Sequence, residues 1–403
     1  MIIDSFFSNH IKEALKNEPP GEWMPTLPEE CIRLSSGYPD PTLVPSIKIK
    51  EAVSKLIEQE QDLPLHYLGS PRMEKLKYQI QNRLAKRGIN VRVNELLITS
   101  GACQAIDLIS RVLLDEDSLV VVEAPTYMEA LEIFQNYTKQ IINIPIDANG
   151  LQTHLLEEVL KDRQQKNLPL PRLLYTIPTA HNPTSTTMEH ERREHLVKLA
   201  EEYNFLIVED DAYGELSFDD EPVPLKAMDT NARVLHVGSL SKVVAPGMRV
   251  GWIAGNEEFI STFAWFKKDL DQPFSQATMA AYLEDIDFEE RILMLKGAYS
   301  KKCETIINSL EIHLPESVTW YKPGGGYFVW VHVPGIDTLE LLERSLKKGI
   351  SFIPGKYFFL NPQDGTEFLR LSFCYEGEAE IIEGIKRLGQ LITQKLNVKS
   401  SLK

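Results

Sequence analysis

The sequence has few cysteines, and they form no recognisable motif. Only four occur in 403 residues, at Cys31, Cys103, Cys303 and Cys374. No two of them make a Cys-x-x-Cys pair, so neither a zinc site of that type nor a disulfide framework is indicated. Isolated thiols are typical of proteins kept in a reducing compartment. We therefore expect a cytoplasmic protein with free cysteines and no metal centre.

Long hydrophobic runs and excess positive charge are also missing. No segment approaches the roughly 18 consecutive apolar residues that a membrane helix needs. The first ten residues lack the basic region and apolar stretch of a signal peptide. Lys and Arg number 43 against 58 Asp and Glu, and the formal net charge of −15 disfavours binding to phosphate backbones. These absences predict a soluble protein that binds neither membranes nor nucleic acid.

Strand-like and helical segments alternate between about residues 95 and 255. Seven apolar runs, rich in Val, Ile and Leu, are the expected strands. They span 95–100, 118–123, 140–145, 172–178, 205–210, 233–238 and 249–254. Continuous apolar strands suit a sheet that is mainly parallel and buried on both faces. We therefore predict an α/β fold with a mostly parallel seven-stranded sheet flanked by helices.

The C-terminal part has a different order of elements. A long helix is expected at about 288–310, and strand, turn, strand, helix, strand and helix follow it, which is typical of a smaller α+β domain. A chain of 403 residues also exceeds what one core usually holds. The Pro-rich first 45 residues are expected to be extended and to pack on this smaller domain. We predict a large domain at 46–299 and a small domain made of 1–45 and 300–403.

The strongest chemical signal lies in the loop after the strand that ends at Gly238. Ser239, Ser241, Lys242 and Arg249 fall within eleven residues of each other. Hydroxyls and a guanidinium bind phosphate well, and a partly desolvated lysine beside them has a lowered pKa and can attack a carbonyl carbon. A lone lysine after a strand is usually a surface residue. The combination of residue types is what predicts a phosphate site with a nucleophilic lysine.

Three further strands are followed by polar residues or glycine. These residues are Asp210 with Tyr213, then Asn182, and then Gly101 at the start of an expected helix. Taken singly, they are typical of solvated acids, of a turn before proline and of an ordinary strand-to-helix turn. However, ligands gather at the C-terminal ends of parallel strands, and a helix N-terminus there attracts an anion. Together with the lysine loop, the four strand ends favour a single ligand site.

These segments resemble the fold-type I, pyridoxal-phosphate-dependent aminotransferases of class I/II. The resemblance extends from 34–41 to 368–373 and includes the motifs SLSK, DDAY and NPT in the family's order. It is strongest for the branch that contains 2-aminoadipate and kynurenine aminotransferases. The same branch includes the C-terminal domains of MocR-type regulators. The resemblance implies a transaminase with pyridoxal 5′-phosphate as its cofactor.

The resemblance also implies roles for individual residues around the cofactor. Lys242 would form a Schiff base with the cofactor. Asp210 would face its pyridinium nitrogen, since the family pattern Asp-x-x-Tyr favours Asp210 over Asp211. Tyr213 joins them as the third catalytic residue. The other implied cofactor contacts are Asn182 and Tyr213 at the ring's 3-oxygen, Tyr127 stacked on the ring, and Gly101, Ala102, Cys103, Ser239, Ser241 and Arg249 around the phosphate.

Substrate and partner contacts follow from the same resemblance. Arg370 would clamp the substrate α-carboxylate, helped by the Gly37 N–H and by Asn182. Tyr67 would reach the phosphate of a neighbouring subunit, which implies a homodimer with shared active sites. Three departures from the family stand out: Ser185 follows the NPT motif in place of glycine, Ala102 lacks a hydroxyl that binds phosphate, and the loop after Tyr67 differs from the usual Y-G-x-x-x-G.

The implied reaction moves an amino group from an L-amino acid to a 2-oxo acid, with 2-oxoglutarate as the expected acceptor, by a ping-pong mechanism. Small amino and oxo acids are thus the expected partners. Another reaction of the same fold, by a lyase, decarboxylase or racemase, is the first alternative. The second is a regulator that senses the cofactor without catalysis. Family motifs that begin by Gly37, and the negative charge, speak against a preceding DNA-binding domain. Side-chain specificity stays open among aromatic, branched-chain and 2-aminoadipate substrates.

Overall fold

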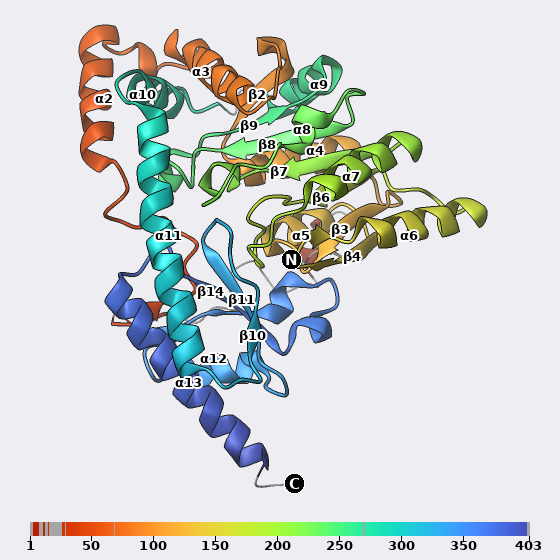
Figure 1. The fold of residues 1–403 in the computed structure, drawn as a ribbon. Coiled ribbons are helices and arrows are strands. Elements are labelled where there is room, and N and C mark those ends of the chain that lie inside the picture. Colours follow the sequence, from red (N-terminus) through yellow and green to blue (C-terminus); the bar gives the residue numbers. More distant parts are fainter. Residues whose placement is uncertain are drawn as a thin grey trace.

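The computed structural model describes residues 3–7, 11–12, 15, 26–28, 30–67, 69–268 and 271–400, without the side chains of residues 4 and 398–400. Figure 1 shows two lobes, one built around a large sheet and the other around a smaller one. Part of the expected extended N-terminal segment lies outside the described residues, and Ile3–Phe6 within it forms a short 3₁₀ helix instead of an extended stretch. Within the same segment, β1 (Ile32–Arg33) pairs in parallel with β12 (Ile350–Ser351) of the smaller lobe.

The large sheet contains all seven expected strands and an eighth. Its spatial order is β2 (Leu96–Thr99), β9 (Gly251–Ala254), β8 (Val234–Ser239), β7 (Leu206–Asp210), β6 (Leu173–Thr176), β3 (Val120–Ala124), β4 (Ile141–Asp147) and β5 (Gly150–Leu151). The four pairings from β8 to β4 are parallel, whereas β9 is antiparallel to both of its neighbours. The prediction of seven strands missed β5, because two residues paired antiparallel with β4 are too short to show a pattern.

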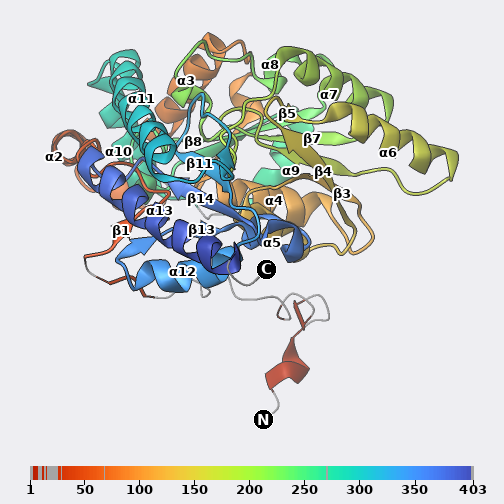
Figure 2. The same ribbon diagram turned by 60° about the horizontal axis from the view of Figure 1, so that its bottom comes forward.

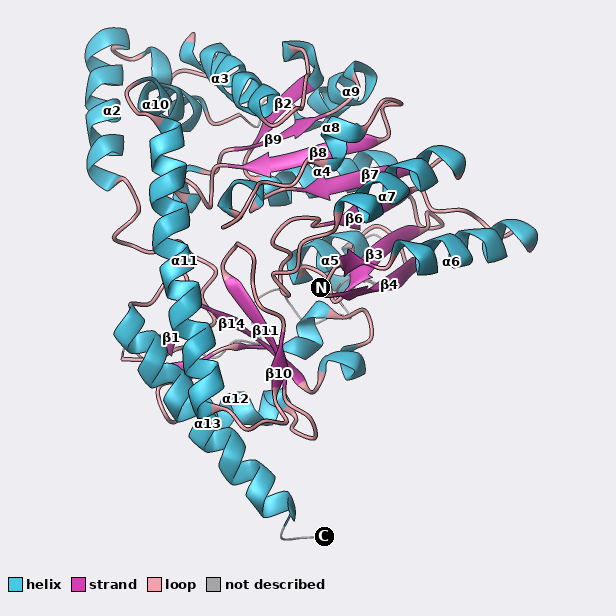
Figure 3. Cartoon of the chain, in the orientation of Figure 1, coloured by secondary structure: helices cyan, strands magenta, loops and turns pink. Residues whose placement is uncertain are grey.

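Both faces of this sheet are covered by helices, as Figure 3 shows. One face carries α4 (Ala102–Leu113), α5 (Met128–Gln135) and α9 (Glu257–Lys267), and the other carries α6 (Thr153–Gln165), α7 (His190–Glu202) and α8 (Leu225–Met228). Within β3, Val120 and Val122 belong to the hydrophobic core under α4, α5 and α9, and Val121 belongs to the core under α6, α7 and α8. Because successive side chains of a strand point to opposite faces, both kinds of position must be apolar.

The smaller lobe is an antiparallel sheet with helices packed beside it (Figure 2). Its strands are β10 (Thr319–Trp320), β11 (Phe328–His332), β14 (Phe368–Ser372) and β13 (Ile353–Pro354), and its helices are α12 (Thr338–Leu346) and α13 (Glu378–Ser400). Helix α11 (Phe288–His313) starts beside the large lobe and packs along α13 in the small one. The predicted domain boundary at 299/300 therefore lies within one continuous helix.

The remaining helices lie at the edge of the large lobe or in connections. Helices α2 (Ser46–Glu60) and α3 (Arg72–Lys86) both pack against α10 (Pro273–Glu284). The short 3₁₀ helices are η1 (Ile3–Phe6), η2 (Leu63–Leu65), η3 (Val93–Glu95), η4 (Gly214–Leu216), η5 (Pro246–Met248), η6 (Gly355–Phe358) and η7 (Pro362–Gly365). Across the described ranges, no helix combines the length and apolarity that crossing a membrane requires. The same ranges contain no cluster of His, Cys, Asp and Glu arranged to hold a metal ion.

Candidate active site

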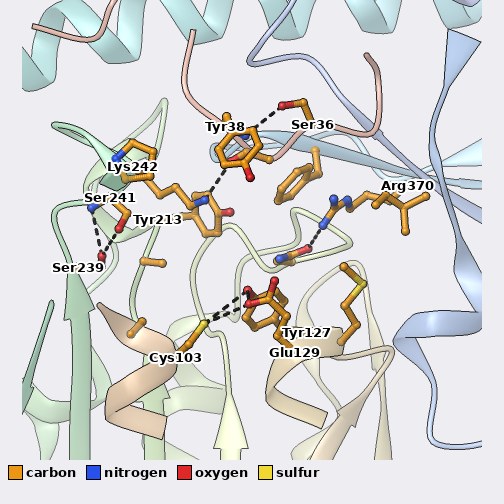
Figure 4. A pocket seen from close by; sticks show the side chains of 18 of the residues that line it. Ser36, Tyr38, Cys103, Tyr127, Glu129, Tyr213, Ser239, Ser241, Lys242 and Arg370 are labelled. Atoms are coloured by element: carbon orange, nitrogen blue, oxygen red, sulfur yellow. Dashed lines mark hydrogen bonds between the residues drawn. The ribbon is translucent and has the colours of Figure 1, made fainter. Parts of the chain in front are cut away.

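A cavity of about 590 Å³ is lined by residues of both lobes. Figure 4 shows several of its side chains converging from the two sides. Most of the predicted site residues line it: Gly37, Ala102, Cys103, Tyr127, Asn182, Asp210, Tyr213, Ser239, Ser241, Lys242, Arg249 and Arg370. Gly101 and Tyr67, two further predicted residues, are not among those that line the cavity. The structure therefore brings together residues that are up to 333 positions apart, from Gly37 to Arg370.

The topology of the large sheet explains why these residues meet. Strands β3, β6, β7 and β8 are parallel neighbours, so their C-terminal ends share one edge. Strand β2 also points this way, because it is antiparallel to β9, which is itself antiparallel to β8. Asp210 ends β7 and Ser239 ends β8, while Gly101, Tyr127 and Asn182 follow β2, β3 and β6. One edge of the sheet thus presents all of these groups to the small lobe.

The side chain of Lys242 reaches the centre of the cavity. Its Nζ donates a hydrogen bond of 2.9 Å to the Gly37 carbonyl oxygen and lies 5.7 Å from the ring centroid of Tyr213. Burial among these groups lowers the pKa of the Lys242 ammonium. The Lys242 backbone is fixed as well, since the Tyr327 hydroxyl donates to its carbonyl oxygen at 2.8 Å. Lys242 is therefore positioned as a nucleophile, and burial makes its proton easier to remove than that of an exposed lysine.

Asp210 is a buried carboxylate with one oxygen left unpaired. The Tyr175 hydroxyl donates to Oδ2 at 2.7 Å, whereas Oδ1 has no hydrogen-bond partner among the described residues. Burial raises the pKa of Asp210 to about 6. The adjacent Asp211 forms an ion pair with Arg87 and does not line the cavity. This difference supports the choice of Asp210 over Asp211, and the partner Tyr175 was not identified from sequence although a buried tyrosine hydroxyl needs one.

An anion-binding cradle lies beside the lysine. Ser239 Oγ donates to Ser241 Oγ at 2.8 Å, and both hydroxyls face the cavity with the Arg249 guanidinium. Helix α4 begins at Ala102, so its first backbone N–H groups and the positive end of its dipole point to this region. Gly101, with φ at +89°, lies against Arg249, whose Nη2 would be 2.7 Å from a Cβ at position 101. Gly101 thus supports the cradle through its lack of a side chain.

A second cationic centre lies on the small-lobe side of the cavity. Arg370 on β14 is only 4% exposed and donates from Nη1 to Asn182 Oδ1 at 2.8 Å and from Nη2 to the Ser35 carbonyl oxygen at 3.2 Å. Its Nε has no partner among the described residues. The guanidinium also lies 4.0 Å from the ring centroid of Phe328. Burial lowers the pKa of Arg370 to about 10, so the group remains cationic at neutral pH and can attract an anion.

Tyr127 and Cys103 share a carboxylate partner that sequence reasoning missed. The Tyr127 hydroxyl and the Cys103 thiol both donate to Glu129 Oε2, the thiol at 3.2 Å. Burial raises the pKa of Cys103 to about 12, so it stays a thiol rather than a thiolate. Glu129 lines the cavity two residues after the predicted Tyr127, but an acid at the start of a helix gives no distinctive signal in sequence.

Ser185, which follows the NPT motif where the family usually has glycine, forms a contact between the lobes. Its hydroxyl donates to the Phe328 carbonyl oxygen of β11 at 2.6 Å. The backbone φ of Ser185 is +55°, a left-handed conformation that glycine adopts more easily. The family's usual glycine therefore suits this turn, and here a serine occupies it and gains a hydrogen bond to β11.

Tyr67 is fully exposed and does not line the cavity of its own chain. Its relative exposure is 102%, and Leu65 nearby is 66% exposed. The predicted position of Tyr67 at a neighbouring subunit's phosphate stays a prediction.

Comparisons with known proteins agree on one family. The family model described as aminotransferase class I and II matches residues 29–388. An aromatic-amino-acid aminotransferase of Thermococcus litoralis is 37% identical over 373 residues, which are 91% of this chain and 89% of that protein. The solved kynurenine aminotransferase of Pyrococcus horikoshii has a TM-score of 0.89 and 35% identity, covering 98% of each chain. LysN, the α-aminoadipate aminotransferase of Thermus thermophilus, has a TM-score of 0.88 and 29% identity, covering 99% of this chain and 100% of that one.

Proposed function

The chain belongs to the class I and II aminotransferases, and from this premise we propose that the cavity between its lobes is the active site. The protein is a pyridoxal-phosphate-dependent enzyme that transfers amino groups, like the other members of this family. The resemblance to the 2-aminoadipate and kynurenine branch is confirmed by the similar proteins. One observation carries the assignment of the site: the Lys242 amine, the Asp210 carboxylate and the Arg249 cradle line the same cavity.

The residues of the cavity fit pyridoxal phosphate. Asp210 Oδ1 is buried without a hydrogen-bond partner among the described residues, and a protonated ring nitrogen would satisfy it. The hydroxyls of Ser239 and Ser241, with Arg249 and the first N–H groups of α4, match the charge and the oxygens of a phosphate. When bound, the cofactor supplies a carbonyl carbon that amines attack and a ring that stabilises negative charge at the substrate Cα.

Lys242, Asp210 and Tyr213 act as the catalytic residues in this proposal. Lys242 Nζ would be the amine that holds the cofactor, and as a free amine it would remove the proton from Cα of the amino donor. Burial favours the neutral amine that this step needs. Asp210 would hold the proton on the ring nitrogen, and Tyr213 would donate to the ring's 3-oxygen. Asn182 would also donate there through Nδ2, because its Oδ1 already accepts from Arg370.

Arg370 binds the α-carboxylate of both substrates. Its buried guanidinium is oriented by Asn182 and Ser35, so little mobility is lost when a carboxylate arrives. The backbone N–H of Gly37 adds a donor from the loop that touches Lys242. Because donor and acceptor both carry an α-carboxylate, one site serves both in turn. This supports a ping-pong reaction between an amino acid and a 2-oxo acid, for which we propose 2-oxoglutarate as the acceptor.

The function is tested by following each half of the reaction. Adding an amino acid alone to the loaded enzyme is expected to convert the cofactor to its amine form, seen as loss of the aldehyde-form absorbance. Adding 2-oxoglutarate afterwards should restore the original spectrum. A panel of aromatic, branched-chain and 2-aminoadipate donors then defines the amino donor. A lyase, decarboxylase or racemase would keep its spectrum between turnovers, and a regulator without catalysis would release no 2-oxo acid; either result contradicts the proposal.

A homodimer with shared active sites is the second part of the proposal. We expect Tyr67→Phe to weaken cofactor binding about tenfold, since it removes one hydrogen bond to a charged group. Titration of the cofactor-free protein with pyridoxal phosphate measures this, and sedimentation shows whether the dimer is kept. Tyr78→Phe, an exposed tyrosine on α3, is the matched control and should bind normally. Unchanged affinity in the Tyr67 variant, or a monomeric wild type, would rule out the shared site.

A further inference from the structure

Two charged side chains in the cavity have no role in the proposed function. Among the described residues that line it, the charged ones with a role are Lys242, Asp210, Arg249 and Arg370. The other two are Glu129 and Arg33. Glu129 is already engaged, since it accepts hydrogen bonds from Tyr127 and Cys103. Arg33 is therefore the charge in the cavity that remains to be explained.

The fold directs Arg33 into the cavity. It lies on β1 between Ile32 and Leu34, both of which are buried in the core of the small lobe. Successive side chains of an extended segment point to opposite sides, so Arg33 faces away from that core. Its backbone is held by the register with Ser351 and by a 2.7 Å hydrogen bond from its N–H to Glu376 Oε1. The position of the side chain is thus set by the strand.

The guanidinium of Arg33 is available for a ligand. It lies 5.9 Å from the ring centroid of Tyr375, which also lines the cavity. Within the described part of the chain, no hydrogen bond or ion pair engages its side-chain nitrogens. The side chain is half-buried, whereas Arg370 is only 4% exposed. The cavity therefore contains one deep arginine bonded to protein groups and a second, more accessible one whose guanidinium forms no hydrogen bond or ion pair with the described residues.

Resting on the proposed function, we propose that Arg33 binds the side-chain carboxylate of a dicarboxylic amino or oxo acid. The planar fork of a guanidinium matches a carboxylate, and Arg370 is already assigned to the α-carboxylate. A substrate that engages both arginines must carry a second anionic group at the far end of its side chain. When a monocarboxylic substrate binds, the half-buried Arg33 guanidinium keeps part of its hydration. Such a substrate lacks the contact with Arg33, but it does not leave a desolvated charge without a partner. The rings of Tyr38 and Tyr375 at the cavity offer such substrates an apolar surface.

The experiment compares acceptors with and without the distal carboxylate. We expect Arg33→Gln to lower kcat/KM for 2-oxoglutarate by about 10- to 100-fold, the range for hydrogen bonds to a charged group, and to leave kcat/KM for 2-oxopentanoate within about twofold. Arg33→Lys keeps the positive charge but not the planar guanidinium, so its kcat/KM for 2-oxoglutarate should lie between those of wild type and Arg33→Gln. It replaces Arg33→Gln as the test variant if that protein folds poorly. Arg172→Gln removes an exposed arginine that does not line the cavity and is the matched control.

A binding measurement separates this inference from the proposed function. Glutarate and pentanoate are not turned over, and calorimetry on the loaded wild type should show tighter binding of glutarate. That preference should disappear in Arg33→Gln and persist in Arg172→Gln. If wild type transfers amino groups but Arg33→Gln keeps its preference for 2-oxoglutarate and glutarate, the role of Arg33 is refuted and the function stands. If wild type transfers no amino group, the function fails, while the glutarate preference still tests Arg33.

Discussion

Replacing Lys242 with alanine is expected to lower the rate of amino transfer by at least about 10⁴-fold, the upper range for loss of a general acid–base group. The amine of Lys242 is enclosed by Gly37 and Tyr213, and burial lowers its pKa. No other lysine lines the cavity among the described residues, so no second amine is placed to take its role. The variant should lose both covalent attachment of the cofactor and proton removal at Cα.

Two measurements check this result. Single-turnover absorbance with an amino donor gives the rate of the first half-reaction. Mass spectrometry after borohydride reduction should show the cofactor attached to wild type and absent from the variant. Lys50→Ala, an exposed lysine on α2, is the control and should match wild type in both. Substantial transfer by the Lys242 variant would show that the cavity is not the active site or that its lysine is dispensable.

The strands and the edge where the ligand site lies could be predicted because both follow from local patterns. Strands buried on both faces must be apolar over most of their length, as Leu173–Tyr175 of β6 and Leu206–Val208 of β7 are, and such runs are visible in the sequence. Parallel strands share one C-terminal edge, so polar residues after Thr176, Asp210 and Ser239 had to converge. The assignment of those residues to a cofactor depended on the resemblance to a family, which supplied what residue types alone do not.

The features that were missed depend on contacts between distant parts of the chain. Arg370 donates a hydrogen bond to the carbonyl oxygen of Ser35, which lies 335 positions earlier in the sequence. The Tyr327 hydroxyl donates to the carbonyl oxygen of Lys242, which lies 85 positions earlier. No hydrophobic period encodes such a pairing, because periodicity reports only which face of an element is buried. The same holds for Arg33, whose neighbours in sequence are core residues of a two-residue strand. Such a strand gives too little pattern to show where its side chains point.

Replacing Asp210 with asparagine is expected to lower kcat/KM by about 10²- to 10³-fold, the range for loss of one preorganised electrostatic contact. Tyr175 can still donate to the amide oxygen, so the local hydrogen bond is kept while the charge is lost. In the cofactor-free wild type, burial raises the pKa of Asp210 from 3.8 to about 6. This shift corresponds to about 3 kcal/mol of folding stability that is lost when the carboxylate ionises.

The change of folding stability with pH distinguishes Asp210 from Asp211. Because the folded state binds the Asp210 proton more tightly than the unfolded state, cofactor-free wild type should lose stability relative to Asp210→Asn as pH rises from about 4 to about 6. Urea unfolding of both proteins across that range measures the difference. Asp211→Asn breaks the buried ion pair with Arg87 and should instead lose about 3–5 kcal/mol of stability. Equal unfolding of wild type and Asp210→Asn at all pH values, with normal turnover, would mean that Asp210 is not the carboxylate facing the cofactor.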